Sequence, residues 1–137
     1  MPIWGAPAGQ SIGSLFTVTG PAMAEVMNIF GGVGVIHRYC TIAEQAEMVR
    51  AAKQNRYHST KNDLHINVGG AVGVTGDFEE RATALHEAGV DFLCIDIAHG
   101  HHILMREAIE TLRCVVGGDK HIMAGNVATI GAINDLA

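Results

Sequence analysis

Polar residues stand directly after several short apolar runs of this chain, where their side chains could bind or react with a ligand. They are His37 and Arg38, then Asp96 and His99, and finally Asn126. Asp96 follows the run Phe92–Ile95, and a carboxylate there is costly to bury unless it binds a ligand, forms an ion pair or accepts hydrogen bonds. Asp96 is therefore the sharpest candidate for a binding role, and capping of the following loop is the alternative.

Three histidines in the stretch His99-Gly100-His101-His102 raise the question of a metal site, because neutral imidazole is a common metal ligand. The stretch lacks the H-E-x-x-H spacing, and no third ligand is specified elsewhere in the sequence. We therefore predict an exposed polar loop with one functional histidine and no bound metal.

A group of glycines follows the apolar run Leu64–Val68. They are Gly69, Gly70, Gly73 and Gly76. Glycines between a strand and a helix could cradle a phosphate, since they let backbone N–H groups approach an anion. Their spacing matches neither G-x-G-x-x-G nor the P-loop, so tight turns and close packing explain most of them better.

The three cysteines, Cys40, Cys94 and Cys114, are an odd number at wide spacing, which indicates neither a disulfide framework nor a zinc ribbon. Cys94 lies two residues before Asp96 and hence on the same face of a strand. Cys40 lies nearest the ligand-binding end, and packing is expected of it rather than catalysis, because free cysteine is commonly a core residue. Unpaired thiols fit a reducing cytoplasm best.

Length and composition limit the classes of function. The chain has 137 residues, which suits one ordinary domain, and its 48% hydrophobic and 17% charged residues are typical of a globular protein. Its net charge of −5 disfavours a nucleic-acid or anionic-membrane surface, so a small molecule is the expected partner. No apolar run approaches the ~20 residues of a membrane span, and the N-terminus lacks the order of a signal peptide.

Short apolar runs alternate with amphipathic stretches, which predicts strands alternating with helices. The predicted strands are Pro2–Gly5, Gly34–Ile36, Leu64–Val68, Phe92–Ile97 and His121–Ala124. The predicted helices start near Pro21, after a capping box of Thr41 and Glu44, after a second capping box of Asp77 and Glu80, at about Ile103 (ending near Val116), and near Thr129. The runs are apolar on both faces, which favours a parallel sheet covered by helices.

About five βα units in series result, and two architectures accept them: an open doubly wound sheet and part of a (β/α)₈ barrel, which needs about 250 residues to close. In both, ligands bind at the C-terminal ends of the strands, so the polar residues named first should share one face. Residues 53–63 break the pattern, and we predict that they form an exposed connector.

Several blocks of the sequence together resemble the inosine monophosphate (IMP) dehydrogenase and guanosine monophosphate (GMP) reductase family. In chain order they are Gly31–Arg38 with Thr41–Gln45, Val68–Gly76, Ala88–Asp91 through Asp96–His101, and Ala124–Thr129. They stand in the family's order and span nearly the whole chain. The D-x-A-H-G-H form and the helix after His37 resemble the dehydrogenase branch more than the reductase branch.

The resemblance implies an α/β fold that is a partial (β/α)₈ TIM barrel, with residues 1–137 as the N-terminal part of a catalytic barrel. It also implies oxidation of IMP by NAD to xanthosine monophosphate through a covalent cysteine adduct, in a tetramer. Asp96 matches the family aspartate that holds the nicotinamide ribose, and Thr75, Ala98 and His99 match positions that border the cofactor. Asn126, with Gly125 beside it, matches the asparagine at the nucleotide and catalytic centre.

Three departures from the family pattern qualify these expectations. Ala6 and Ala8 stand where the family has a serine and a methionine that touch the nucleotide, and the loop of residues 6–16 is altered. The connector at 53–63 is too short for the regulatory module that many members insert. The family's catalytic cysteine loop and potassium site have no counterpart in these residues, so the isolated chain is expected to be inactive. The alternatives are a GMP reductase and a non-catalytic half-barrel that binds a nucleotide or a partner chain.

Overall fold

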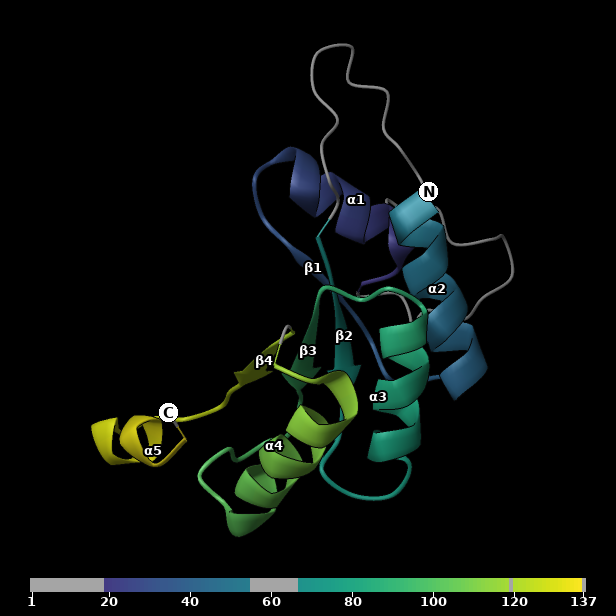
Figure 1. Cartoon of the computed structure of the whole chain (residues 1–137). Coiled ribbons are helices and arrows are strands. Elements are labelled where there is room, and N and C mark those ends of the chain that lie inside the picture. The colour runs from purple at the N-terminus through teal and green to yellow at the C-terminus, as the bar shows by residue number, and fades with distance from the viewer. Residues whose placement is uncertain (1–18, 55–66, 119, 137) are drawn as a thin grey trace.

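The computed structural model describes residues 19–54, 67–118 and 120–136, in which strands and helices alternate along the chain (Figure 1). The strands are β1 (Gly34–Ile36), β2 (Val68–Val72), β3 (Phe92–Ile95) and β4 (His121–Ala124). The helices are α1 (Pro21–Ile29), α2 (Ile42–Gln54), α3 (Phe78–Glu87), α4 (Ile103–Val116) and α5 (Ile130–Leu136). The predicted strand Pro2–Gly5 and the altered loop at 6–16 lie outside the described residues.

The four strands form one parallel sheet in the sequential order β1-β2-β3-β4. Crossovers between parallel strands are right-handed, so strands that are added in one direction place all their helices on one face. Figure 1 shows α2, α3 and α4 side by side on the same face of the sheet, with α5 beyond the β4 edge. This arrangement is that of part of a (β/α)₈ barrel, and it excludes the doubly wound sheet, which has helices on both faces.

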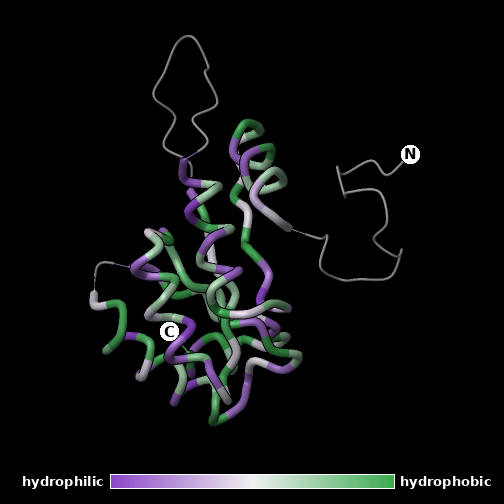
Figure 2. Tube along the Cα trace, turned by 90° about the vertical axis from the view of Figure 1, so that its right-hand side faces the viewer, coloured by the Kyte–Doolittle hydropathy of each residue, from purple (hydrophilic) through white to green (hydrophobic). Residues whose placement is uncertain are grey.

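The core lies between the sheet and this layer of helices. Its largest fully buried apolar side chains are Ile36, Val49, Val68, Val72, Leu85, Val90, Leu93, Ile95, Met105 and Leu112. Hydrophobic and hydrophilic stretches alternate along the helices in Figure 2, as expected of helices that bury one side. On the other face of the sheet, Met123 is 49% exposed. That face corresponds to the interior of a barrel, which is open in the part of the chain that the structure describes.

The capping box predicted at the start of α2 is confirmed. Thr41 Oγ1 accepts a hydrogen bond from the Glu44 N–H at 3.2 Å, and a Glu44 carboxylate oxygen accepts one from the Thr41 N–H at 2.9 Å. The bond that the carboxylate accepts from the Thr41 N–H, and a second one from the Thr41 hydroxyl at 2.8 Å, lower the pKa of Glu44 below its ordinary value. The local pattern of residues therefore predicts this helix start correctly.

The capping box predicted for α3 is wrong. Asp77 occupies the N-cap position but makes no capping hydrogen bond through its side chain. Its carboxylate instead accepts a hydrogen bond from Arg81 at 2.7 Å. An arginine one turn into the helix competes for the same carboxylate, and the charge-assisted bond is the stronger of the two.

The second correction concerns β2, which runs from Val68 to Val72 and not from Leu64 to Val68. Gly69 and Gly70 therefore lie inside the strand and not in the loop that follows it. Close packing explains them, because a Cβ at Gly69 would overlap the Phe92 ring and one at Gly70 would lie 2.8 Å from Leu85 Cδ1. The position of β2 leaves Gly73 and Gly76 in the loop before α3.

Two smaller differences concern the ends of β3 and α2. β3 ends at Ile95, two residues earlier than predicted. Lys53 and Gln54 belong to α2 and not to the connector, whose remaining residues lie outside the described ones. No helix in the described ranges is long and apolar enough to cross a membrane.

Candidate functional site at the carboxyl edge of the sheet

Four loops meet at the edge where the parallel strands end. They carry His37 and Arg38 after β1, residues 73–77 after β2, residues 96–100 after β3, and Gly125 and Asn126 after β4. Parallel pairing brings the carboxyl ends of all four strands to one side of the sheet. The candidate residues from sequence therefore do lie on one edge of the fold.

Arg38 links the first loop to the third. Its Nε lies 3.8 Å from Asp96 Oδ2, and its NH2 group donates a hydrogen bond to the Asp96 carbonyl oxygen at 3.2 Å. The guanidinium passes over the end of β2, where a Cβ at Gly73 would lie 3.5 Å from the Arg38 NH1 nitrogen. Arg38 thus spans from β1 across β2 to the end of β3.

Asp96 is more accessible than the sequence predicted. Its side chain is 48% exposed, so it is not buried, and Arg38 is its ion-pair partner. A pair this exposed contributes only about 0–1 kcal/mol, so a ligand can approach the carboxylate without breaking a strong contact. Asp96 is therefore free to accept hydrogen bonds from hydroxyl groups on its open side.

The Tyr39 ring packs against the Arg38 side chain. The Arg38 Cζ atom lies 5.6 Å from the centre of the Tyr39 ring, which is a cation–π distance. The ring also stacks on His37, with ring centres 6.5 Å apart and an interplanar angle of 22°. The three side chains after β1 therefore stabilise one another's orientation.

The loops after β3 and β4 touch through their backbones. The Gly100 N–H donates a hydrogen bond to the Asn126 carbonyl oxygen at 3.0 Å, and a Cβ at Gly100 would overlap the Gly125 carbonyl oxygen. Asn126 itself has a φ of 60°, a left-handed conformation that asparagine tolerates better than most residues. The loop that carries Asp96 is thus joined to the one that carries Asn126.

The other candidate residues lie on these same loops. Ala98 and His99 are exposed between Asp96 and Gly100, and Gly125 is half-buried beside Asn126. Thr75 is exposed in the loop after β2, and its carbonyl oxygen would lie 3.8 Å from a Cβ at Gly73. The structure therefore places all the candidate residues on the loops that follow β2, β3 and β4 at this edge.

The histidine stretch forms contacts within the fold. His102 caps α4, since its Nδ1 accepts a hydrogen bond from the Leu104 N–H at 3.1 Å. His101 Nε2 lies 2.8 Å from Asp135 Oδ2 and joins this loop to α5. In the described part of the chain, no group of three His, Cys, Asp or Glu residues could hold a metal ion.

Cys40 and Cys94 show no sign of activation. Burial raises the pKa of the Cys40 thiol, although Arg81 opposes this effect. Burial also raises the pKa of the Cys94 thiol, and the negative charge of Asp96 raises it further. Both thiols are therefore protonated at neutral pH and poor nucleophiles. This agrees with the packing role expected of Cys40, and Cys114 is exposed on α4.

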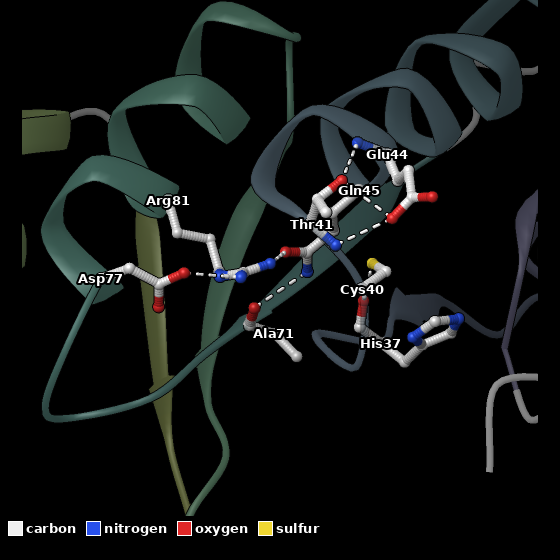
Figure 3. A network of polar contacts seen from close by, with 8 residues as sticks. All are labelled: His37, Cys40, Thr41, Glu44, Gln45, Ala71, Asp77 and Arg81. Carbon is white, nitrogen blue, oxygen red and sulfur yellow. Dashed lines mark hydrogen bonds and ion pairs between the residues drawn. The ribbon is translucent and has the colours of Figure 1, made fainter. Parts of the chain in front are cut away.

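The sequence pattern does not predict a polar network beneath the edge that links the buried Gln45 and Arg81 to the half-exposed Asp77. This network consists of Gln45 on α2, Arg81 on α3 and Asp77 before α3 (Figure 3). Gln45 is fully buried and Arg81 is 6% exposed. The signal that could have revealed it is the position of Gln45, next to Ile42, Ala46 and Val49 on the apolar face of α2.

Comparison with known proteins identifies the family. The family model described as IMP dehydrogenase / GMP reductase domain matches residues 12–137. The IMP dehydrogenase of Mycobacterium leprae is 40% identical over 80 residues, which are 58% of this chain and 15% of that protein. A GMP reductase of Mycobacterium tuberculosis is 33% identical over 132 residues, which are 96% of this chain and 26% of that protein.

A solved structure agrees with the fold. The IMP dehydrogenase from Legionella pneumophila has a TM-score of 0.73 and 35% identity, covering 86% of this chain and 32% of that one. The match confirms the predicted partial barrel, and the chain spans only between 15% and 32% of the length of these proteins. The family model that matches and the agreement in fold show that the chain belongs to the IMP dehydrogenase / GMP reductase family of oxidoreductases.

Proposed function

We propose that the carboxyl edge of this sheet is the cofactor and substrate side of an IMP dehydrogenase, which oxidises IMP to xanthosine monophosphate with NAD. One observation carries the proposal: the half-exposed Asp96 carboxylate stands on a loop that is joined by Gly100 to the loop of Asn126. Family membership indicates the reaction, and this geometry would bring IMP and NAD together at one edge of the sheet.

The residues present fit a dinucleotide. A carboxylate at a strand end accepts hydrogen bonds from the two hydroxyl groups of a ribose, which is how many NAD sites recognise their ligand. Asp96 would hold the nicotinamide ribose, and Thr75, Ala98 and His99 would border the cofactor. Bound NAD would supply the hydride acceptor. Arg38 would hold the Asp96 carboxylate in place along the edge.

Asn126 would serve the substrate. Its neutral amide both donates and accepts hydrogen bonds, so it can orient a purine nucleotide without adding charge. The bond from Gly100 holds its backbone in place, and Gly125 leaves room beside it. We further infer that the protein works in the cytoplasm as a homo-oligomer, which the unpaired cysteines and the family resemblance support.

A second candidate is GMP reductase activity. It is favoured by the extent of the match to the mycobacterial GMP reductase, which covers 96% of this chain, whereas the match to the Mycobacterium leprae dehydrogenase covers 58%. The two activities are distinguished by NADH formation from IMP and NAD on one side, and by NADPH-dependent loss of ammonia from GMP on the other.

Calorimetric titration of the 137-residue chain with NAD, in the presence of IMP, tests the proposal without requiring turnover. Replacing Asp96 by alanine should weaken NAD binding about tenfold or more, because hydrogen bonds to a charged group contribute about 1.5–3 kcal/mol. Glu87→Ala is the matched control, since it removes an exposed carboxylate at the far end of α3. Absence of NAD binding, or equal binding by the Asp96→Ala and Glu87→Ala variants, would refute the proposal.

A further inference from the structure

Gln45 connects two strand ends to a helix through three hydrogen bonds. Its side-chain Nε2 donates to the carbonyl oxygens of Ile36 at 3.1 Å and Ala71 at 2.9 Å. Its Oε1 accepts from Arg81 at 2.8 Å, and Asp77 holds the other side of Arg81 at 2.7 Å. Figure 3 shows this chain of contacts from Asp77 through Arg81 and Gln45 to Ala71. Both N–H groups and the oxygen of the fully buried carboxamide are thereby hydrogen-bonded.

The pairing of β1 with β2 shows which backbone contact the Gln45 carboxamide supplies. β1 ends at Ile36, which pairs with Gly70, whereas β2 continues to Val72. The described ladder between the two strands thus has no β1 residue opposite Ala71. Gln45 donates to the Ala71 carbonyl, as a backbone N–H of a longer β1 would, and it also donates to the Ile36 carbonyl at the end of β1. The side chain therefore holds the end of β1 beside β2.

The two clamped residues lie just before the ligand-binding edge. Arg38 comes two residues after Ile36, and Gly73 comes two residues after Ala71. Arg38 passes over Gly73 on its way to Asp96, so the relative placement of these two strand ends decides whether its guanidinium reaches the carboxylate. A shift of β1 against β2 would move Arg38 relative to Asp96.

We propose that Gln45 is a positioning residue for this edge: by clamping the ends of β1 and β2 it places Arg38 against Asp96, and the ligand affinity of the edge depends on it. The inference depends on the proposed function only for the identity of the ligand. The geometry of the Arg38–Asp96 pair is a property of the chain by itself and can be measured without any ligand.

Packing alone does not require an amide at this position. The neighbours of Gln45 on the buried face of α2 are Ile42, Ala46 and Val49, and a methionine has nearly the same length and volume as a glutamine. Gln45→Met keeps the packing and removes all three hydrogen bonds. Gln45→Glu keeps the acceptor for Arg81 and the shape, and it removes the two donors to the strand carbonyls. Val49→Ala, one turn further along the same helix at a fully buried position, disturbs packing and no polar contact.

The three variants are compared with the wild type by urea unfolding, by NAD titration and by the NMR signal of the Arg38 Nε–H group. Both Gln45 variants should weaken NAD binding about tenfold or more, since a displacement of ~1 Å can cost a site up to about 10²-fold. Both should also shift the Arg38 signal. Val49→Ala should lower stability and leave the NAD affinity and the Arg38 signal unchanged.

The outcomes separate this inference from the proposed function. If the wild type binds no NAD, the proposed function fails. The Arg38 signal alone then tests whether Gln45 positions Arg38. An Arg38 signal that is unchanged in Gln45→Met and Gln45→Glu overturns the inference. So does an NAD affinity that falls equally in Val49→Ala, because loss of packing would then explain the effect. If Gln45→Met does not fold, Gln45→Glu, which keeps the Arg81 contact, gives the result.

Discussion

Replacing Gly100 by alanine should destabilise the protein, because the loops after β3 and β4 touch there through backbone atoms. A Cβ at Gly100 would overlap the Gly125 carbonyl oxygen, and it would lie 3.1 Å from both the Gly125 carbonyl carbon and Val127 Cγ1. A backbone carbonyl cannot rotate away as the end of a flexible side chain can. The two loops must therefore separate to admit the methyl group.

The size of the effect follows from two contributions to the free energy of unfolding. Forcing an extra carbon into a packed position costs about 1–3 kcal/mol. Separation of the loops also breaks the hydrogen bond from the Gly100 N–H to the Asn126 carbonyl, 3.0 Å long, which contributes about 1 kcal/mol. We expect a loss of about 2–4 kcal/mol, a large part of the 5–15 kcal/mol that typically stabilises a domain.

Urea unfolding followed by circular dichroism measures this loss. Gly125→Ala is the control, because a Cβ at Gly125 would meet nothing within 4 Å and its φ is not positive. That variant should change stability by less than about 1 kcal/mol. An unfolding midpoint of Gly100→Ala equal to that of Gly125→Ala would show that the two loops are not held together as the structure indicates.

Two further predictions concern titratable groups. The hydrogen bond from Arg81 holds the pKa of Asp77 below its ordinary value, so this stabilisation is present above the unfolded pKa of about 4 and is lost as the pH falls through the folded pKa. Asp77→Asn should therefore lower stability at neutral pH, and its difference from the wild type should shrink below about pH 4; a difference that stays constant in urea unfolding across this range would contradict the assignment. Among the cysteines, Cys114 should react first with iodoacetamide in the native protein, because it is exposed whereas burial raises the pKa of Cys40 and Cys94. Mass spectrometry after timed labelling measures the order, and equal rates for all three would contradict it.

Local signals predicted some elements to the residue. The bounds of α4, Ile103–Val116, and of β4, His121–Ala124, agree with those predicted from apolar periodicity. The capping box of Thr41 and Glu44 is equally local, since both partners lie within one helical turn. Such features depend on neighbours in sequence, so a pattern of residue types is sufficient to find them.

Features that depend on distant partners escaped the same reasoning. The sequence pattern predicts a loop for the glycines of β2, whereas their close contacts come from Phe92 and Leu85, at least 15 positions later in the chain. The ion pair of Arg38 with Asp96 joins residues 58 positions apart, and Gln45 contacts Arg81 across 36 positions. Such pairs leave no periodic pattern of residue types in the sequence.

The sequence by itself therefore determined the alternation of strands and helices, the parallel sheet and the family, because each of these is written in local periodicity or in contiguous motifs. It also determined which loops carry the polar residues at the strand ends. Only the tertiary structure decided how those loops meet: that Arg38 crosses Gly73 to reach Asp96, that Gly100 must be a glycine to touch Gly125, and that a buried glutamine holds two strand ends together. The physical reason is that these contacts form between segments brought together by packing of the core, and their energies depend on distances that exist only in the folded chain.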